Sequence, residues 1–286
     1  MKVKVFMNHI LPDHKGALRV AAISDIHSNW AALEAVLTHL KETEHPDAIL
    51  FMGDYVTDFP YPQRTLTLVR QAAAQVPSFF IRGNREEYLL NDFHPDTLDR
   101  SAYSIPSTQA GSLIYTAERL TNEDWTWFDL LPIHAKLKIG QAPPITVCHG
   151  SPTDSRALLY PGSEALEHTT QQLTTELLIH GHTHHRTLIH TPGHRIVGVG
   201  QIAYNIRRVH WTEARFSSYL ADPQANRATA YASLTMLDWT PDPQDTPNDT
   251  NATNSTHPYP LRFLDIPYDP AELTRDIRTS EPSTLA

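Results

Sequence analysis

The chain has 286 residues, a formal net charge of −9 at pH 7 and one cysteine, Cys148. This length allows one large α/β domain or two small ones, and the acidic balance argues against nucleic acid as a partner. The lone cysteine excludes an internal disulfide, and no run reaches the roughly 20 apolar residues of a membrane helix, so we expect a cytoplasmic protein without a membrane partner.

The first part of the chain alternates between short apolar runs and segments of helical spacing. The apolar runs predict buried strands at residues 18–24, 48–52 and 79–82. The helical segments begin near Asn29, at Pro62 and at Glu86, and Ser28 or Asn29 is placed to cap the first of them. This rhythm is typical of strand–helix–strand units with a parallel sheet.

The middle of the chain reads as helical over residues 100–135 and then returns to strands. Thr121 and Asp124 resemble a capping box ahead of an aromatic cluster at residues 125–128, which we expect in the core. Further strands are predicted at residues 145–148, 177–180 and 195–199, with a helix near residues 163–176. Cys148 lies in one of these apolar strands, so we expect it to be a buried small hydrophobe.

The last part of the chain turns to strands at residues 229–237 and 261–266 and ends in a short helix from Pro270. Between these strands, residues 240–258 are rich in Pro, Asp, Asn and Thr and predict a flexible insertion. We expect an α/β fold with a two-sheet β-sandwich core and flanking helices. Residues 1–16 would form an N-terminal extension, and residues 17–286 a single domain.

Short polar motifs stand just after the predicted strands, where open α/β sheets bind their ligands. Their imidazole, carboxylate and amide groups suit two divalent ions of borderline softness, so we expect Mn or Fe, with Zn or Ni as alternatives. The motifs are Asp25-Ile26-His27, Gly53-Asp54, Gly83-Asn84-Arg85-Glu86, His149-Gly150 and Gly181-His182-Thr183-His184.

Two such ions about 3.5–4 Å apart can clamp a phosphoryl oxygen and share a hydroxide that is a strong nucleophile near neutral pH. A carboxylate with two oxygens is the natural bridge between them, and Asp54 in its tight Gly-Asp turn fits this role. The alternative for Asp54 is an ordinary turn residue. Tyr55, Asp58 and Tyr61, which follow it, are candidates for the lining of a substrate cleft.

The order of these motifs over residues 18–205 resembles that of the calcineurin-like metallophosphoesterases. The sequences around the motifs, SDIHSN, HGSP and GHTH, are most similar to those of the small bacterial and archaeal phosphoesterase branch. The resemblance implies that one group of residues holds the first metal, a second group holds the other metal, and Asp54 bridges the two. The first group is Asp25, His27 and His184, and the second group is Asn84, His149 and His182.

One position departs from the family, which usually has His where this chain has Arg85. A guanidinium does not release its proton near neutral pH, so it cannot be a general acid, but it can bind phosphate through two hydrogen bonds. The alternative is a structural ion pair with Glu86, Glu87 or another carboxylate. The missing His argues against fast cleavage of alkoxide leaving groups and favours a diester or an anhydride.

The leading hypothesis is therefore a two-metal hydrolase that uses a bridging hydroxide to cleave phosphodiester or phosphoanhydride bonds. Its substrate would be a small phosphorylated molecule such as a nucleotide, and a homo-oligomer is compatible with the sequence. Asp54 and Arg85 are the candidate catalytic residues, with Arg85 also binding substrate. Two alternatives stay open: a phosphomonoesterase, including a serine/threonine protein phosphatase, and a non-catalytic scaffold that keeps the metal ligands.

Overall fold

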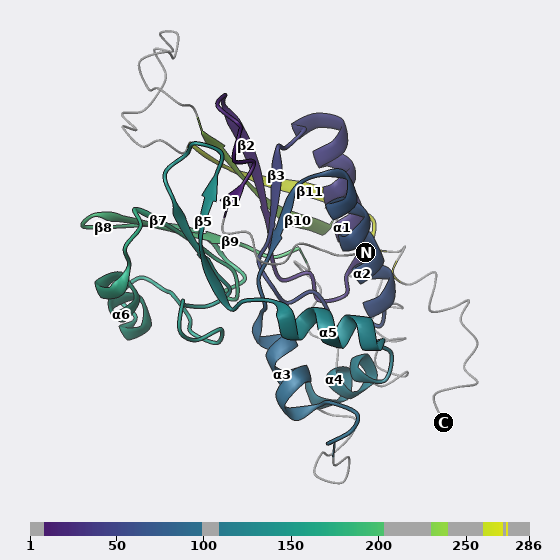
Figure 1. Ribbon diagram of the computed structural model, residues 1–286. Helices are drawn as coiled ribbons and strands as arrows, with labels where there is room; N and C mark the ends of the chain where they lie inside the picture. The colour runs from purple at the N-terminus through teal and green to yellow at the C-terminus, as the bar shows by residue number, and fades with distance from the viewer. Residues whose placement is uncertain (1–8, 99–108, 203–229, 240–259, 271–272, 274–286) are drawn as a thin grey trace.

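Two β-sheets pack face to face, and helices cover their outer sides (Figure 1). The computed structural model describes residues 9–98, 109–202, 230–239, 260–270 and 273. The predicted α/β fold with a two-sheet sandwich core and flanking helices is confirmed. In the described residues, no helix combines the length and the apolar character needed to cross a bilayer.

The first sheet has the strand order β11-β10-β2-β3-β4. Its strands β2, β3 and β4 come from the first part of the chain and are parallel to one another. From the C-terminal part, β10 runs antiparallel to β2, and β11 runs antiparallel to β10. The strands are β2 (Leu18–Ile23), β3 (Ala48–Phe51), β4 (Ser78–Phe80), β10 (Ala230–Trp239) and β11 (Leu261–Tyr268).

The second sheet has the order β1-β5-β6-β7-β9-β8, and its strands β6, β7 and β9 are parallel to one another. β5 runs antiparallel to β6, and β8 runs antiparallel to β9. The strands are β1 (His9–Ile10), β5 (His134–Ile139), β6 (Ile145–Cys148), β7 (Leu177–His180), β8 (Arg186–Thr191) and β9 (His194–Val199).

The helices α1 and α2 flank the first sheet, α6 lies beside the second, and α3, α4 and α5 gather at one end of the molecule (Figure 1). Asn29 caps α1 through its side chain, and Thr121 and Asp124 form the predicted capping box of α5. The helices are α1 (Trp30–His39), continued by a π-turn η1 (Leu40–Glu44), α2 (Pro62–Gln75), α3 (Asn84–Asp92), α4 (Gln109–Ala117), α5 (Asn122–Leu130) and α6 (Glu164–Gln172).

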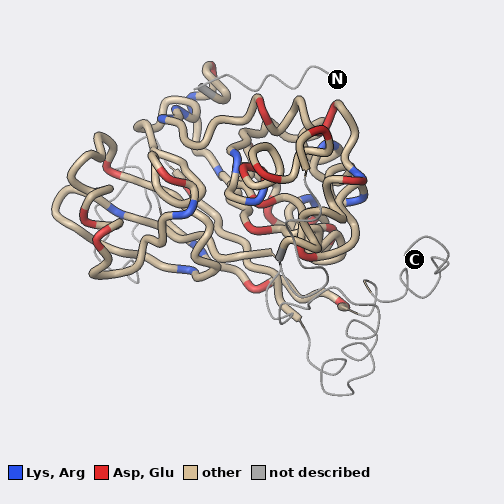
Figure 2. The backbone as a smooth tube through the Cα atoms, turned by 90° about the horizontal axis from the view of Figure 1, so that it is seen from below, with Lys and Arg blue, Asp and Glu red and all other residues tan. Residues whose placement is uncertain are grey.

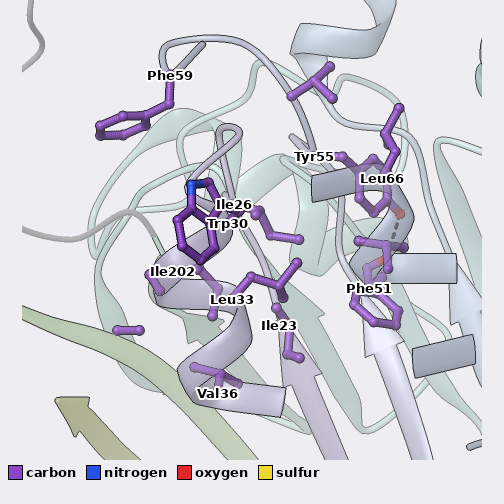
Figure 3. Close-up of a cluster of buried hydrophobic side chains, with 14 of the residues drawn as sticks. Ile23, Ile26, Trp30, Leu33, Val36, Phe51, Tyr55, Phe59, Leu66 and Ile202 are labelled. Atoms are coloured by element: carbon purple, nitrogen blue, oxygen red, sulfur yellow. Dashed lines mark hydrogen bonds between the residues drawn. The ribbon is translucent and has the colours of Figure 1, made fainter. Parts of the chain in front are cut away.

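Side-chain alternation along β2 explains the sandwich. Successive residues of a strand point to opposite faces. Val20 and Ala22 therefore lie in the core between the two sheets, whereas Ala21 and Ile23 pack toward the helices. Figure 3 shows Ile23 beside Leu33 and Val36 of α1. Both faces of this strand are buried, as its continuous apolar run predicts.

The helical prediction for residues 100–135 is wrong at its end, because β5 begins at His134. Polar and apolar residues alternate through His134–Ile139, which is the period of a half-buried strand. The other strands that the sequence did not predict are β1 and the edge strand β8. Helix α3 also begins two residues before Glu86, at Asn84.

The division of the chain into domains stays a prediction. Residues 9 and 10 of the expected N-terminal extension pair with β5 in the second sheet. The expected insertion at residues 240–258 lies outside the described residues, as does most of the expected helix from Pro270.

Candidate metal centre

All five polar motifs meet at one end of the sandwich. Asp25 and Asp54 follow the parallel strands β2 and β3, and Asn84 opens the helix after β4. His149 follows β6, and His182 and His184 follow the parallel neighbour β7. The carboxyl ends of parallel strands meet at the same edge of a sheet, so motifs far apart in the sequence are brought together.

The first cluster consists of Asp25, His27 and His184. The Nε2 atom of His184 lies 3.1 Å from Oδ1 of Asp25 and 3.2 Å from Nε2 of His27. The Nε2 atom of His27 lies 3.7 Å from the same Oδ1 of Asp25. Three potential ligand atoms thus converge, as the family resemblance implies for the first metal.

The second cluster consists of Asp54, His149 and His182, with Asn84 beside them. The Nε2 atom of His149 lies 3.1 Å from Oδ1 of Asn84 and 3.4 Å from Oδ1 of Asp54. The Nε2 atom of His182 donates a hydrogen bond to the carbonyl oxygen of Arg156, at 3.0 Å. This contact leaves Nδ1 of His182 available for a metal.

Asp54 belongs to the second cluster and also faces the first, with one carboxylate oxygen directed to each side. Its Oδ2 atom is 3.8 Å from Nε2 of His27 in the first cluster. Its Oδ1 atom is 3.4 Å from Nε2 of His149 in the second. This is the arrangement that a bridging carboxylate requires. The Oδ1 atom of Asp54 also accepts a hydrogen bond from the backbone N–H of Arg85, at 2.8 Å.

The buried ligands are held by a second set of contacts that leave one atom directed into the site. The Oδ2 atom of Asp25 accepts hydrogen bonds from the Ser24 hydroxyl, at 2.6 Å, and from the backbone N–H of His182, at 3.0 Å. Its Oδ1 atom is buried, accepts no other hydrogen bond within the described residues and faces the imidazole of His184 at 3.1 Å. The Nδ1 atom of His149 donates to the Met52 carbonyl, which directs Nε2 inward. A buried carboxylate oxygen that faces imidazole nitrogens fits a shared cation.

The pKa values of the clustered side chains also indicate a site for cations. Burial alone raises the pKa of Asp25 and Asp54, but the nearby imidazoles outweigh it and hold both pKa values well below their ordinary range. Burial lowers the pKa of His149, yet the carboxylates of Asp54 and Asp25 together raise it to about 10. The anionic pair therefore attracts positive charge, and bound metal ions would displace the His149 proton.

The backbone is strained where it carries these side chains. Left-handed conformations are uncommon for residues other than glycine and concentrate at functional sites. Five candidate ligands adopt positive φ values: Asp25, His27, Asp54, His182 and His184. Gly53 has a φ of +91°, and a Cβ atom there would stand 2.6 Å from the backbone nitrogen of Gly83. Only glycine therefore fits beside the proposed bridge.

Glu86 has a role that the sequence did not reveal. Its buried carboxylate accepts the backbone N–H groups of Asp54, Tyr55 and Gly83, each at 2.9 Å. It thereby joins the turn after β3 to the turn after β4. Burial, followed by the charge of Asp54, raises the pKa of Glu86 to about 7. The only sequence signal was its place in the Gly83–Glu86 motif.

Arg85 is buried within the site and contacts a carboxylate. Its Nη2 atom lies 3.1 Å from Oδ2 of Asp58, and its Nε atom lies 3.8 Å from Oδ2 of Asp54. The same oxygen of Asp58 lies 3.2 Å from Nδ1 of His27. Asp58 is thus beside the site, as expected for a cleft residue, and it forms an ion pair with the Arg85 guanidinium.

The expectation that Tyr55 lines a cleft is wrong. Its side chain is fully buried beside Phe51 (Figure 3), and its hydroxyl donates to the carbonyls of Phe51 and Ile81. Tyr61 contacts Trp30 edge-on and precedes α2.

The cluster at residues 125–128 packs in the core, and Cys148 is a buried thiol, as predicted.

Comparison with known proteins identifies the family. A model described as calcineurin-like phosphoesterase matches residues 18–186, more than half of the chain, so the chain belongs to this family. It is 28% identical to UDP-2,3-diacylglucosamine hydrolase of Proteus mirabilis over 199 residues, which cover 59% of this chain and 82% of that protein.

Two solved structures share the fold. A hypothetical protein from Pyrococcus horikoshii matches with a TM-score of 0.66 at 20% identity, covering 91% of this chain and 92% of the other. A metallophosphoesterase from Sphaerobacter thermophilus matches with a TM-score of 0.60 at 21% identity, covering 93% and 96%. The family and the hydrolase relative support a metal-dependent hydrolase, and the two clusters indicate a binuclear centre for divalent ions.

Proposed function

We propose that this protein hydrolyses phosphodiester or phosphoanhydride bonds at a binuclear metal centre. The observation that carries the proposal is the placement of Asp54, with one carboxylate oxygen toward each cluster. Asp25, His27 and His184 would hold one ion, and Asn84, His149 and His182 the other. Bound there, two divalent ions would supply positive charge for phosphoryl oxygens and a strong nucleophile from water near neutral pH.

Residues around the two clusters orient the candidate metal ligands, and some of them would bind the substrate. Ser24 and the Met52 carbonyl orient Asp25 and His149. Arg85 would donate hydrogen bonds to a phosphoryl oxygen, while Asp58 holds its guanidinium beside Asp54. An arginine at this position does not protonate a leaving group, which favours substrates whose leaving groups are stable as anions.

The similarity to a UDP-2,3-diacylglucosamine hydrolase supports the anhydride branch of the proposal, because the UDP group named there contains a diphosphate. In the view of Figure 2, basic and acidic residues are interspersed over both halves of the described chain. The proposed substrate is a small phosphorylated molecule such as a nucleotide. The proposal includes Mn or Fe as the bound metals, with Zn or Ni as alternatives, and a cytoplasmic location.

The test is an assay of three substrates with chelated protein and with protein reloaded with Mn²⁺. They are an aryl phosphodiester, a nucleoside diphosphate sugar and an aryl phosphomonoester. We expect Mn²⁺ to restore cleavage of the diester or the diphosphate, with the monoester cleaved more slowly. Elemental analysis should find two metal ions per chain.

Preferred cleavage of the monoester would favour the phosphatase alternative. Absence of turnover with any of the expected metals, together with retained metal binding, would favour the scaffold. Less than half an equivalent of metal after purification in Mn²⁺ would contradict the binuclear centre.

A further inference from the structure

A loop after β6 carries a second arginine to the candidate metal centre. The backbone carbonyl of Arg156 accepts a hydrogen bond from Nε2 of His182, one of the candidate ligands, at 3.0 Å. The preceding residue, Ser155, donates its hydroxyl to the carboxylate of Glu87 on α3. The loop is therefore fixed both to a ligand of the second cluster and to the helix that begins with Asn84.

The side chain of Arg156 lies along the same helix. Its guanidinium carbon is 4.6 Å from the centre of the Tyr88 ring. Tyr88 is one turn beyond Asn84 on α3, and residues four apart share a helix face. The guanidinium thus lies on the face of α3 that has the candidate ligand Asn84 at its start. Stacking on an aromatic ring orients a guanidinium without neutralising its charge.

The carboxylates beside Arg156 accept hydrogen bonds from other groups than its guanidinium: Asp154 accepts the backbone N–H of Arg156 at 2.8 Å, and Glu87 accepts the Ser155 hydroxyl. Arg85 is paired with Asp58 at 3.1 Å, and Arg186, just after His184, is paired with Asp265 at 2.9 Å. Across the part of the chain that the structure describes, Arg156 has no ion pair, and its side chain is exposed. Its backbone is fixed to His182 of the second cluster, and its charged side chain stacks on Tyr88 and is accessible.

We infer that Arg156 binds a second anionic group of the substrate, beside the phosphoryl group held at the metal pair, and that the substrate is a diphosphate. Arginine suits this role because its planar fork binds phosphate oxygens through two parallel hydrogen bonds. A phosphodiester without a neighbouring phosphate would leave this cation unused. The inference rests on the proposed function and selects the anhydride branch within it.

The test compares the binding of ADP, used as its non-hydrolysable α,β-methylene analogue, with that of AMP to the Mn²⁺-loaded protein by calorimetry, because the two ligands differ in the second phosphate. The wild-type chain should bind ADP more tightly than AMP. Arg156→Ala should weaken ADP binding by about tenfold or more, as expected for loss of hydrogen bonds to a charged group, and leave AMP binding within about twofold. Arg156→Lys should recover part of the difference, since lysine keeps the charge but not the fork.

A matched control is Arg119→Ala, which removes a similar arginine that stacks on Tyr115 at 3.4 Å in another part of the fold. This variant should bind both nucleotides as the wild type does. Equal weakening of ADP and AMP by Arg156→Ala, or no weakening of either, would overturn the assignment of Arg156 while leaving the metal-centred function intact. If the wild-type protein bound neither nucleotide nor inorganic phosphate, the proposed function itself would fail, and the inference with it.

Discussion

Asp54 is the residue that faces both candidate clusters and that we propose as their bridge. Its two oxygens face His27 on one side and His149 on the other, and a backbone N–H from Arg85 fixes one of them. A residue shared by two metal sites has consequences for both when it is changed, whereas a ligand of one cluster affects mainly that cluster. This difference gives the bridge a distinctive mutational pattern.

We expect Asp54→Asn to abolish turnover and to loosen both metals. His27→Ala should weaken mainly the first metal site, and Asn84→Ala mainly the second. The loss of the bridge should cost on the order of several kcal/mol of transition-state stabilisation. Metal content by elemental analysis and steady-state kinetics measure these effects, with the exposed Asp96→Asn as the control. Near-normal turnover of Asp54→Asn would refute the binuclear mechanism.

Substitution of the buried Arg85 distinguishes a role in substrate binding from a structural ion pair. If it binds phosphate, Arg85→Ala should lower kcat/KM for every substrate regardless of the leaving group. If its contact with Asp58 is only structural, the change should lower the free energy of unfolding and leave the kinetics of the folded protein intact. We expect the first outcome.

Arg85→His is the sharper variant, because imidazole titrates near neutrality and can supply a proton. It should raise activity on alkyl phosphomonoesters more than on aryl diesters, whose leaving groups need little protonation. Equal changes on both kinds of substrate would show that this position does not control protonation of the leaving group.

At the level of the elements, Glu86 joins the start of α3 to the turn after β3. Its carboxylate satisfies three buried backbone N–H groups, from Gly83, Asp54 and Tyr55. Two ligand-bearing turns therefore share one acceptor. The position of Asn84 relative to Asp54 depends on this contact as much as on the strands that precede them.

Glu86→Ala should lower the free energy of unfolding by about 3 kcal/mol or more, since an unsatisfied buried donor costs roughly 1–3 kcal/mol. It should also weaken metal binding, because Asp54 and Asn84 would lose their common anchor. Denaturant unfolding of the metal-free protein and metal titration measure the two effects. The exposed Glu42→Ala should change stability by less than about 0.5 kcal/mol. A similarly small change for Glu86→Ala would contradict the anchoring role.

At the level of the whole molecule, the C-terminal strand is tied to the N-terminal half by charge. Arg262 on β11 donates to both carboxylate oxygens of Glu44 in η1, at 3.0 and 2.8 Å, and to Asp238 on β10 at 2.9 Å. Hydrogen bonds from Arg262 lower the pKa of Glu44 below its ordinary value of 4.5. The ionised form of Glu44 is therefore favoured in the folded state.

A lowered carboxyl pKa contributes stability that is fully present above the ordinary pKa and is lost as the pH falls through the folded-state value. The free energy of unfolding should accordingly decrease below about pH 4.5, in part through Glu44. Arg262→Ala should lower stability at neutral pH and flatten this acid dependence. Unfolding curves measured across the acid range test this, with the exposed Lys41→Ala as a control. Parallel pH profiles for Arg262→Ala and the wild type would contradict it.

The sequence by itself determined the fold class, most strands and the family, because apolar runs and glycine-flanked polar motifs are local patterns. It located the ligand candidates Asp25, His149 and His184 through their place after predicted strands. It missed β5, where the helical interpretation was carried past Leu130 into a segment that alternates with a period of two.

Only the tertiary structure decided which side chains meet. Glu86 takes two of its three N–H partners from a turn about 30 residues away, and Arg156 approaches α3 and His182 through a loop from the other sheet. Whether Arg85 pairs with Glu86, Glu87 or Asp58 depends on side-chain directions at a helix start, which local patterns do not specify. The order of strands in the two sheets sets these distances, because it brings carboxyl ends together regardless of their separation along the chain.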